Sequence, residues 1–90
     1  MSRVRLRVWA RGHVQGVFFR AEARARAESL GVAGWIRNNW DGTVEALFEG
    51  ESDAVERLVE LCRKGPSGAR VDRVEVSSEE REGLRGFEIL

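Results

Sequence analysis

A glycine loop that leads into an arginine is the stretch of this chain best suited to chemistry. Its residues are Gly12, His13, Val14, Gln15, Gly16, Val17, Phe18, Phe19 and Arg20. Glycine adopts positive φ without steric cost, so the loop can turn tightly with its amides pointing inward together. The helix predicted from Phe19 adds free N–H groups and a positive dipole end, and the planar guanidinium of Arg20 matches phosphate oxygens. Many helical arginines are simply solvated, but this loop favours a small tetrahedral anion, and we predict a phosphate site.

Asn38 is the second candidate, because it ends a predicted strand just before a turn. Asparagine also suits such positions for conformational reasons alone. In a split β-α-β arrangement, however, the loop after the first strand and the end of the second strand can fall at the same edge of the sheet. An uncharged amide at that edge could hold a water molecule by donating and accepting hydrogen bonds.

The remaining reactive side chains are weaker candidates for a catalytic or metal-binding role. His13 is the only histidine, and base catalysis is one interpretation, but a solvent-facing side chain whose backbone binds the ligand is favoured. Cys62 falls on the apolar stripe of a predicted helix, which indicates a buried structural thiol. One histidine and one cysteine cannot supply a typical zinc site. Glu45 and Glu49 share a strand face with Leu47, away from the proposed pocket.

Hydrophobic periodicity predicts the elements that position these residues. The first half of the chain is predicted as a strand over 3–11, a helix from Phe19 that ends at Gly31, and strands over 32–38 and 43–49, which are joined by an Asn39-Trp40-Asp41-Gly42 hairpin turn. A second helix follows, which is capped by Ser52 or Asp53 and ended by residues 65–68. The chain then forms a strand through Val71, Val74 and Val76, a polar loop over 77–86, and a last strand over 87–90. This order predicts an α+β fold, a ferredoxin-like α/β sandwich (βαββαβ). Its sheet is mostly antiparallel, with two helices on one face and the other face open. We expect one domain over residues 1–90.

Composition limits the partners. Fifteen basic residues balance fifteen acidic ones, which argues against general nucleic-acid binding. Trp9, Trp35 and Trp40 with nearby arginines could stack on bases, but ordinary packing is favoured because no RNP1-type pattern accompanies them. No apolar run approaches a membrane span or a signal peptide, so we expect no membrane association and a cytoplasmic location. The small size and mixed surface favour a monomer.

Two motifs together resemble one family. The stretch from Gly12 to Arg20 is similar to the acylphosphatase signature G-x-V-Q-G-V-x-F-R. The stretch from Gly34 to Val44, with Gly50 six residues later, resembles the second signature of the same family. The similarity extends over nearly the whole chain, including residues 66–71.

The resemblance implies the ferredoxin-like fold and hydrolysis of the carboxyl–phosphate bond of acyl phosphates. It implies that Arg20 binds the phosphoryl group and that Asn38 positions the attacking water. The cradle would be formed by the amides of His13, Val14, Gln15, Gly16, Val17 and Phe18. No metal or cofactor is implied, the substrate is a small acyl phosphate and inorganic phosphate is a product. One departure is Asn39, where many relatives carry Thr or Ser, which affects a supporting hydrogen bond.

Two other interpretations compete with an acylphosphatase. A ferredoxin-like binding module would explain the fold and the arginines, but not a glycine loop leading into Arg20. An acylphosphatase-like domain of a larger maturation assembly would explain the motifs. Because the sequence ends with the last strand and shows no linker, we expect no partner domains. The physiological acyl phosphate is left open by the sequence.

Overall fold

The computed structural model describes residues 2–90, and the predicted order of elements is confirmed. The elements are β1 (Arg3–His13), α1 (Phe19–Leu30), β2 (Ala33–Asn38), β3 (Val44–Glu51), α2 (Ser52–Lys64), β4 (Arg70–Glu79) and β5 (Phe87–Ile89). The five strands form one sheet in the order β4-β1-β3-β2-β5. β3 is therefore the central strand, and β1 is an interior strand between β4 and β3, with both of which it pairs in antiparallel register.

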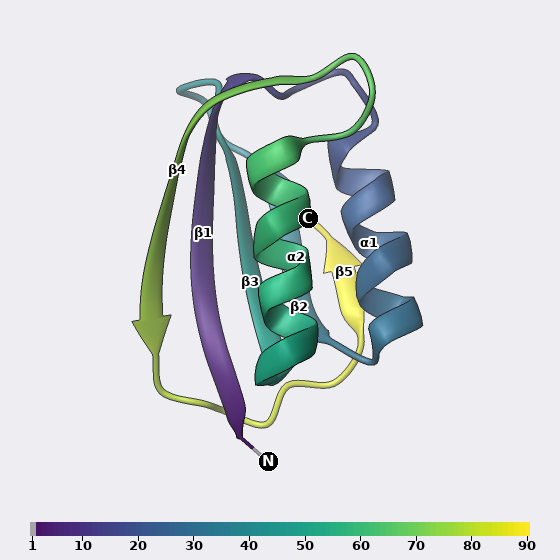
Figure 1. The fold of residues 1–90 in the computed structure, drawn as a ribbon, viewed down its shortest axis with the longest axis vertical. Helices are drawn as coiled ribbons and strands as arrows, with labels where there is room; N and C mark the ends of the chain where they lie inside the picture. Colours follow the sequence, from purple (N-terminus) through teal and green to yellow (C-terminus); the bar gives the residue numbers. More distant parts are fainter. Residues whose placement is uncertain (1) are drawn as a thin grey trace.

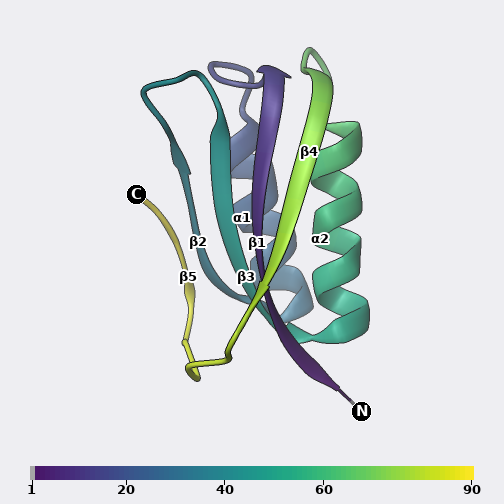
Figure 2. The same cartoon turned by 90° about the vertical axis from the view of Figure 1, so that its left-hand side faces the viewer.

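The sheet is mixed at one edge only. β2 is antiparallel to β3 but parallel to β5, the short edge strand. Figures 1 and 2 show both helices on the same face of the sheet, with α2 over the β4 side and α1 over the β5 side. This arrangement confirms the ferredoxin-like α+β fold.

The core fills the space between the helices and this face. Phe19, Ala23 and Ala27 from α1 are buried, and so are Val55, Leu58 and Cys62 from α2. The sheet contributes the alternate residues that face the helices, including Val8, Ala10, Ile36, Val44, Ala46 and Phe48. Burial of these apolar surfaces is the main favourable term in folding. The apolar periodicities of β1 and of both helices therefore identified the correct faces.

The opposite face carries no helix, yet its centre is not exposed. Seven successive residues of β3, from Val44 to Gly50, are buried. Leu47 on this face lies opposite Arg7 of β1 and Trp35 of β2. Long charged and aromatic side chains cover the central strand here, since arginine can lay its apolar stem over a surface and keep its head polar.

Several element boundaries differ from the sequence predictions. β1 continues to His13, because beyond a bulge at Arg11 and Gly12 it pairs again with Val71 and Arg70. Ser77–Glu79 were expected in a polar loop, but they extend β4 alongside Arg5–Arg7. The expected side-chain cap of α2 is wrong, since the helix begins at Ser52 and no side chain caps it.

The topology brings the two candidate segments to the same end of the sheet. Figures 1 and 2 show the loop after β1 and the β2–β3 turn at that end, beside the N-terminus of α1. The turn is closed as predicted, because the amide of Asn39 donates to the Thr43 carbonyl and the amide of Gly42 donates to that of Asn39. No helix within residues 2–90 is both long and apolar enough to cross a membrane.

Candidate active site

The loop after β1 begins at a bulge that requires glycine. Gly12 has a φ of 131°, and a Cβ placed on it would lie 2.2 Å from the carbonyl oxygen of Arg70. Only a residue without a side chain permits this close approach between β1 and β4. Gly16 has a φ of 76° with open space around it, so here glycine is favoured by the backbone conformation alone.

Two apolar side chains fix the loop to the body of the chain. Val14 is 1% exposed and belongs to the core, and Val17 packs against it. Within the part of the chain that the structure describes, the main-chain N–H groups of residues 15–18 donate no hydrogen bond. The loop thus combines a fixed backbone with unused donors, which is the requirement for an anion cradle.

Phe18 joins the loop to α1 in an unusual conformation. It has φ 61° and ψ 21°, in the left-handed region, and its side chain makes no capping hydrogen bond to the helix. A phenylalanine in this region is strained, and such strain is concentrated at functional sites. Because no side chain caps α1, its first N–H groups remain available for an anion at the positive end of the helix.

Gln15 ties the loop to the β2–β3 turn through its side chain. Its Nε2 donates to the carbonyl oxygens of Asn39 and Thr43, each at 2.9 Å. The turn is stiffened in addition by Asp41, whose Oδ1 accepts from the amide and the hydroxyl of Thr43. These bonds hold the strand end that carries Asn38 in a constant position relative to the loop.

Arg20 and Asn38 line one cavity of about 300 Å³, together with Val14, Gly16, Phe18, Ala21 and Ile89. The structure therefore brings together the arginine from α1, the asparagine from β2 and part of the glycine loop. Asn38 Oδ1 is buried and has no hydrogen-bond partner within residues 2–90. A buried polar atom without a partner is costly and is rare away from functional sites. Because Asn38 lines this cavity, a ligand or a water bound there is the candidate for the missing donor.

Arg20 keeps its charge free for a ligand. It is partly buried in the first turn of α1, and none of the ion pairs found among residues 2–90 involves it. Nine other arginines within residues 2–90 pair with carboxylates, as Arg24 does with Glu28 one turn further along α1. A guanidinium without a carboxylate, beside free N–H groups, attracts a phosphoryl group.

His13 lies apart from this constellation. It is the last residue of β1, opposite Arg70, rather than inside the loop as expected. Its side chain is exposed, and it does not line the cavity of Arg20 and Asn38. The solvent-facing interpretation of His13 agrees with this placement. A role for its main-chain amide in the cradle stays a prediction.

A larger groove between the helices has a different character. Its volume is about 1080 Å³, and its charged lining includes Glu22, Arg26, Glu56 and Arg57. These side chains carry both signs, and neither the glycine loop nor Asn38 reaches the groove. Its arginines, Arg26 and Arg57, lie among the carboxylates of Glu22, Asp53, Glu56 and Glu60. The groove also lacks the glycine loop and Asn38 that line the smaller cavity, and we therefore take the smaller cavity as the candidate active site.

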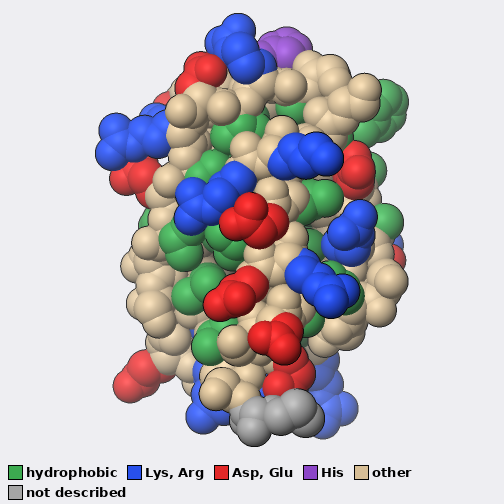
Figure 3. Space-filling model, viewed as in Figure 1, with side chains coloured by type: hydrophobic (Ala, Val, Ile, Leu, Met, Phe, Trp, Pro, Cys, Tyr) green, Lys and Arg blue, Asp and Glu red, His purple; other side chains and the backbone are tan. Residues whose placement is uncertain are grey.

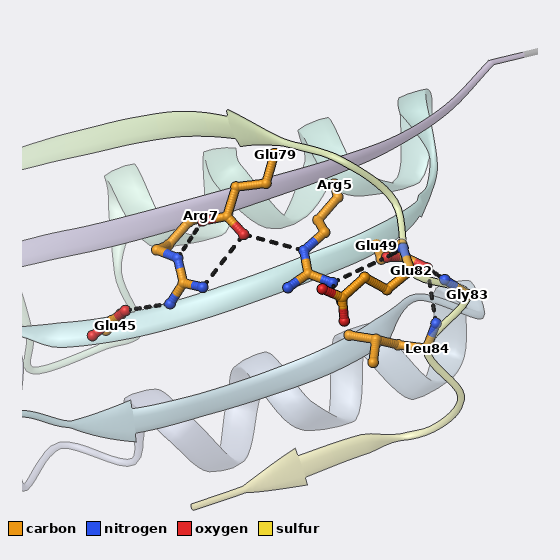
Figure 4. A network of polar contacts seen from close by, with 8 residues as sticks. All are labelled: Arg5, Arg7, Glu45, Glu49, Glu79, Glu82, Gly83 and Leu84. Atoms are coloured by element: carbon orange, nitrogen blue, oxygen red, sulfur yellow. Dashed lines mark hydrogen bonds and ion pairs between the residues drawn. The ribbon is translucent and has the colours of Figure 1, made fainter.

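A network of ion pairs and hydrogen bonds supports the site from the face without helices (Figure 4). Glu45 accepts from Nη1 of Arg7 at 2.6 Å. It also accepts from Nη2 of Arg37 at 3.0 Å. Both guanidiniums also lie over the ring of Trp35, at 5.2 and 5.0 Å from its centroid. This packing agrees with the structural interpretation of Trp35, whereas for Trp40 that interpretation is wrong, because its side chain is fully exposed. Sequence reasoning missed the network, although the alternation of Arg5 and Arg7 opposite two glutamates on a strand was a signal for it.

The carboxylates of this network are held ionised. Burial alone would raise the pKa of Glu45, but hydrogen bonds from Arg7, Asn39 and Arg37 outweigh it and leave the pKa below its ordinary value. The amide of Glu82 is the main cause of a lowered pKa of Glu49, which burial opposes and the amides of Leu84 and Gly83 reinforce. Both side chains are therefore anions at neutral pH.

The other reactive groups are placed as structural elements. Burial raises the pKa of Cys62 to about 12, so its thiol stays protonated and unreactive, as its position on the helix stripe predicted. Within residues 2–90, no three histidine, cysteine or acidic side chains come together in a way that could hold a metal ion.

Comparison with known proteins agrees with this geometry. The family model described as acylphosphatase matches residues 6–89. An acylphosphatase of Rubrobacter xylanophilus is 58% identical over 86 residues, which cover 94% of this chain and 78% of the relative. One of Gloeobacter violaceus is 54% identical over 87 residues, covering 97% of this chain and 94% of the relative.

A solved structure gives the same result for the fold. The crystal structure of an acylphosphatase from Bacillus subtilis superposes with a TM-score of 0.92 at 34% identity, covering 97% of this chain and 98% of the other. Fold, motifs and sequence similarity over nearly the whole length thus agree, and the chain belongs to the acylphosphatase family, whose members hydrolyse acyl phosphates.

Proposed function

We propose that this chain hydrolyses the carboxyl–phosphate bond of acyl phosphates to a carboxylate and inorganic phosphate, by in-line attack of water and without a metal ion. The observation that carries the proposal is the pairing of two unused groups in one cavity. Both residues line that cavity. Within residues 2–90, Arg20 makes no ion pair and Asn38 has a buried oxygen without a hydrogen-bond partner.

The amides of residues 13–18 and the guanidinium of Arg20 hold the phosphoryl group. An acyl phosphate has a good carboxylate leaving group, so its departure needs little protonation. The loose transition state spreads negative charge over the phosphoryl oxygens, and fixed donors stabilise that charge without reorganising. The free N–H groups of the loop and the uncapped start of α1 support this role.

Asn38 positions the attacking water. Its Oδ1 accepts a hydrogen bond from the water and its Nδ2 can donate one, which orients the water for attack on phosphorus. The asparagine cannot take a proton at neutral pH, so a phosphoryl oxygen of the substrate takes the proton of the water. A pH–rate profile whose inflection disappears in His13→Ala would contradict this proton path.

We also propose that the chain is a monomer, that it acts in the cytoplasm on a small diffusing substrate, and that it does not bind nucleic acid. Positive and negative side chains alternate over the helical face in Figure 3, and neither sign gathers into a large patch there. The balanced net charge points the same way, because binding to a polyanion draws on an excess of lysine and arginine.

Release of phosphate from benzoyl phosphate and acetyl phosphate, with and without EDTA, tests the function. We expect hydrolysis of both substrates, unchanged by EDTA. Arg20→Lys should lower kcat/KM by about 100-fold, because a point charge cannot reproduce the planar fork. Arg24→Lys on the same helix is the matched control and should stay within about two-fold of the parent, because Arg24 is exposed and its ion pair among residues 2–90 is with the equally exposed Glu28.

Each result bears on a separate part of the proposal. An inactive parent chain would overturn the function. Loss of activity with EDTA would overturn the metal-free mechanism, and a fully active Arg20→Lys would overturn the role of the guanidinium fork.

A further inference from the structure

Glu45 is a buried carboxylate directly behind the strand end that carries Asn38. It is 5% exposed and lies on β3 opposite Arg37 of β2. Three donors converge on it, because Oε2 accepts from Arg7, while Oε1 accepts from Arg37 and from Asn39 Nδ2 at 3.1 Å. Only a carboxylate offers acceptor sites in all these directions and no competing donor.

Asn39 is the residue through which this carboxylate reaches the site. Its side-chain amide donates to Glu45 and also to Thr43 Oγ1 at 3.0 Å. Its main-chain N–H donates to the Thr43 carbonyl, and its own carbonyl accepts from Gln15 of the glycine loop. Asn39 is therefore held from the loop on one side and from Glu45 on the other, and it is bonded directly to Asn38.

Stability alone is a weak explanation for a carboxylate in this place. Desolvation of a buried ion pair offsets much of its Coulomb energy, and an apolar replacement is often as stable. An apolar residue at position 45 would leave the Asn39 amide without its second acceptor. The arrangement is specific in orientation, which is what a water-positioning group requires.

We propose that Glu45 is a positioning residue for hydrolysis, whose carboxylate fixes the Asn39 amide and thereby the direction of the Asn38 side chain. The inference rests on the proposed function, since it concerns the water that Asn38 orients. Glu45 itself does not line the cavity and touches neither water nor phosphate. Its influence passes through the main chain shared by Asn38 and Asn39.

Kinetics of Glu45→Gln on benzoyl phosphate test the inference. A glutamine turns its NH2 group toward one of the three donors, so we expect kcat to fall about 10-fold. The inhibition constant of inorganic phosphate should change less than about two-fold, because Arg20 and the loop amides are untouched. Glu79→Gln is the matched control, because Glu79 binds Arg7 and Arg5 in the same network but does not reach Asn39; its kcat should stay within about two-fold of the parent.

A double-mutant cycle with Asn39→Ala separates positioning from general destabilisation. If Glu45 acts through Asn39, Glu45→Gln lowers kcat in the parent but adds no loss in the Asn39→Ala background. Glu45→Asp keeps the negative charge for Arg7 and Arg37, but its shorter side chain withdraws from Asn39. We therefore expect the same loss of kcat. This variant replaces Glu45→Gln in the test if the glutamine variant does not fold. Multiplicative losses, or an unchanged kcat in a folded Glu45 variant, would overturn the inference. An inactive parent chain would instead overturn the proposed function.

Discussion

Replacing Glu49 with glutamine should lower the stability of the fold at the segment that leads into β5. Glu49 is 2% exposed, and its two oxygens accept three main-chain N–H groups. Oε1 accepts from Glu82 at 2.9 Å, and Oε2 accepts from Gly83 at 2.7 Å and from Leu84 at 2.9 Å. Figure 4 shows this carboxylate between the connection to β5 and the guanidinium of Arg5.

The structure sets the magnitude. A glutamine has one carbonyl oxygen, which can keep the bonds to Gly83 and Leu84, while its NH2 group faces the N–H of Glu82. An unsatisfied donor costs about 1–3 kcal/mol, and each remaining bond loses the advantage of a charged acceptor. Residues 82 and 83 are exposed, so water relieves part of this cost. We therefore expect the free energy of unfolding to fall by about 2 kcal/mol, or Tm by about 10 °C.

Urea denaturation at pH 7 measures the difference. The matched control is Glu51→Gln, two residues along the same strand, whose pair with Arg3 at 3.6 Å is about half exposed and should contribute under about 0.5 kcal/mol. A loss in Glu49→Gln no larger than that of the control would refute the reasoning.

The pH dependence gives a second check with a definite sign. The pKa of Glu49 is lowered in the folded chain, so its contribution is fully present above the unfolded pKa of about 4.3 and is lost as pH falls through the folded value. The gap between parent and variant should therefore be constant near neutrality and should shrink in acid. A gap that widened as pH fell would contradict the assignment.

Three further outcomes are expected. Asn38→Ala should lower kcat by about 100-fold and leave the inhibition constant of inorganic phosphate within about two-fold, and a collapse of phosphate affinity would contradict the water-positioning role. Gly12→Ala should lower the free energy of unfolding by roughly 2 kcal/mol, measured in urea, because the added Cβ meets the Arg70 carbonyl oxygen. Cys62 should resist Ellman's reagent at pH 8 in the native chain and react once urea unfolds it, since its pKa is raised to about 12; rapid native reaction would contradict its burial.

The fold could be predicted from the sequence because its signals are local and agree with one another. Strict alternation in β1, helical spacing from Phe19 and the Asp41-Gly42 turn each point to one element, and their order leaves few topologies. Apart from the expected cap of α2, which is a local error, the errors occurred where pairing between distant segments decides the outcome. Ser77–Glu79 look like loop residues, but they become strand because β1 offers them a pairing edge.

The candidate site could also be predicted only in part from the sequence. Arg20 and Asn38 could be identified from residue type and position, and their common cavity follows from the predicted strand order. The contacts that hold them could not be identified, because they depend on side-chain directions. Gln15 was expected to contribute an amide, and its side chain proves to join the loop to the turn. Glu45 was placed away from the pocket, which is correct, but its bond to Asn39 depends on the register between β2 and β3.

The interior position of β1 in the sheet has a consequence for how the chain folds. β1 comes first in the sequence, yet its two neighbours come from Val44–Glu51 and Arg70–Glu79. Pairings across such long separations must close large loops before they are stabilised, so folding should take on the order of milliseconds to seconds. Until then β1 is an unpaired strand with one apolar face, and such strands are a usual starting point for aggregation. Arg3, Arg5 and Arg7 on its second face oppose the approach of another copy, and the same charges later join the ion pairs of the finished sheet.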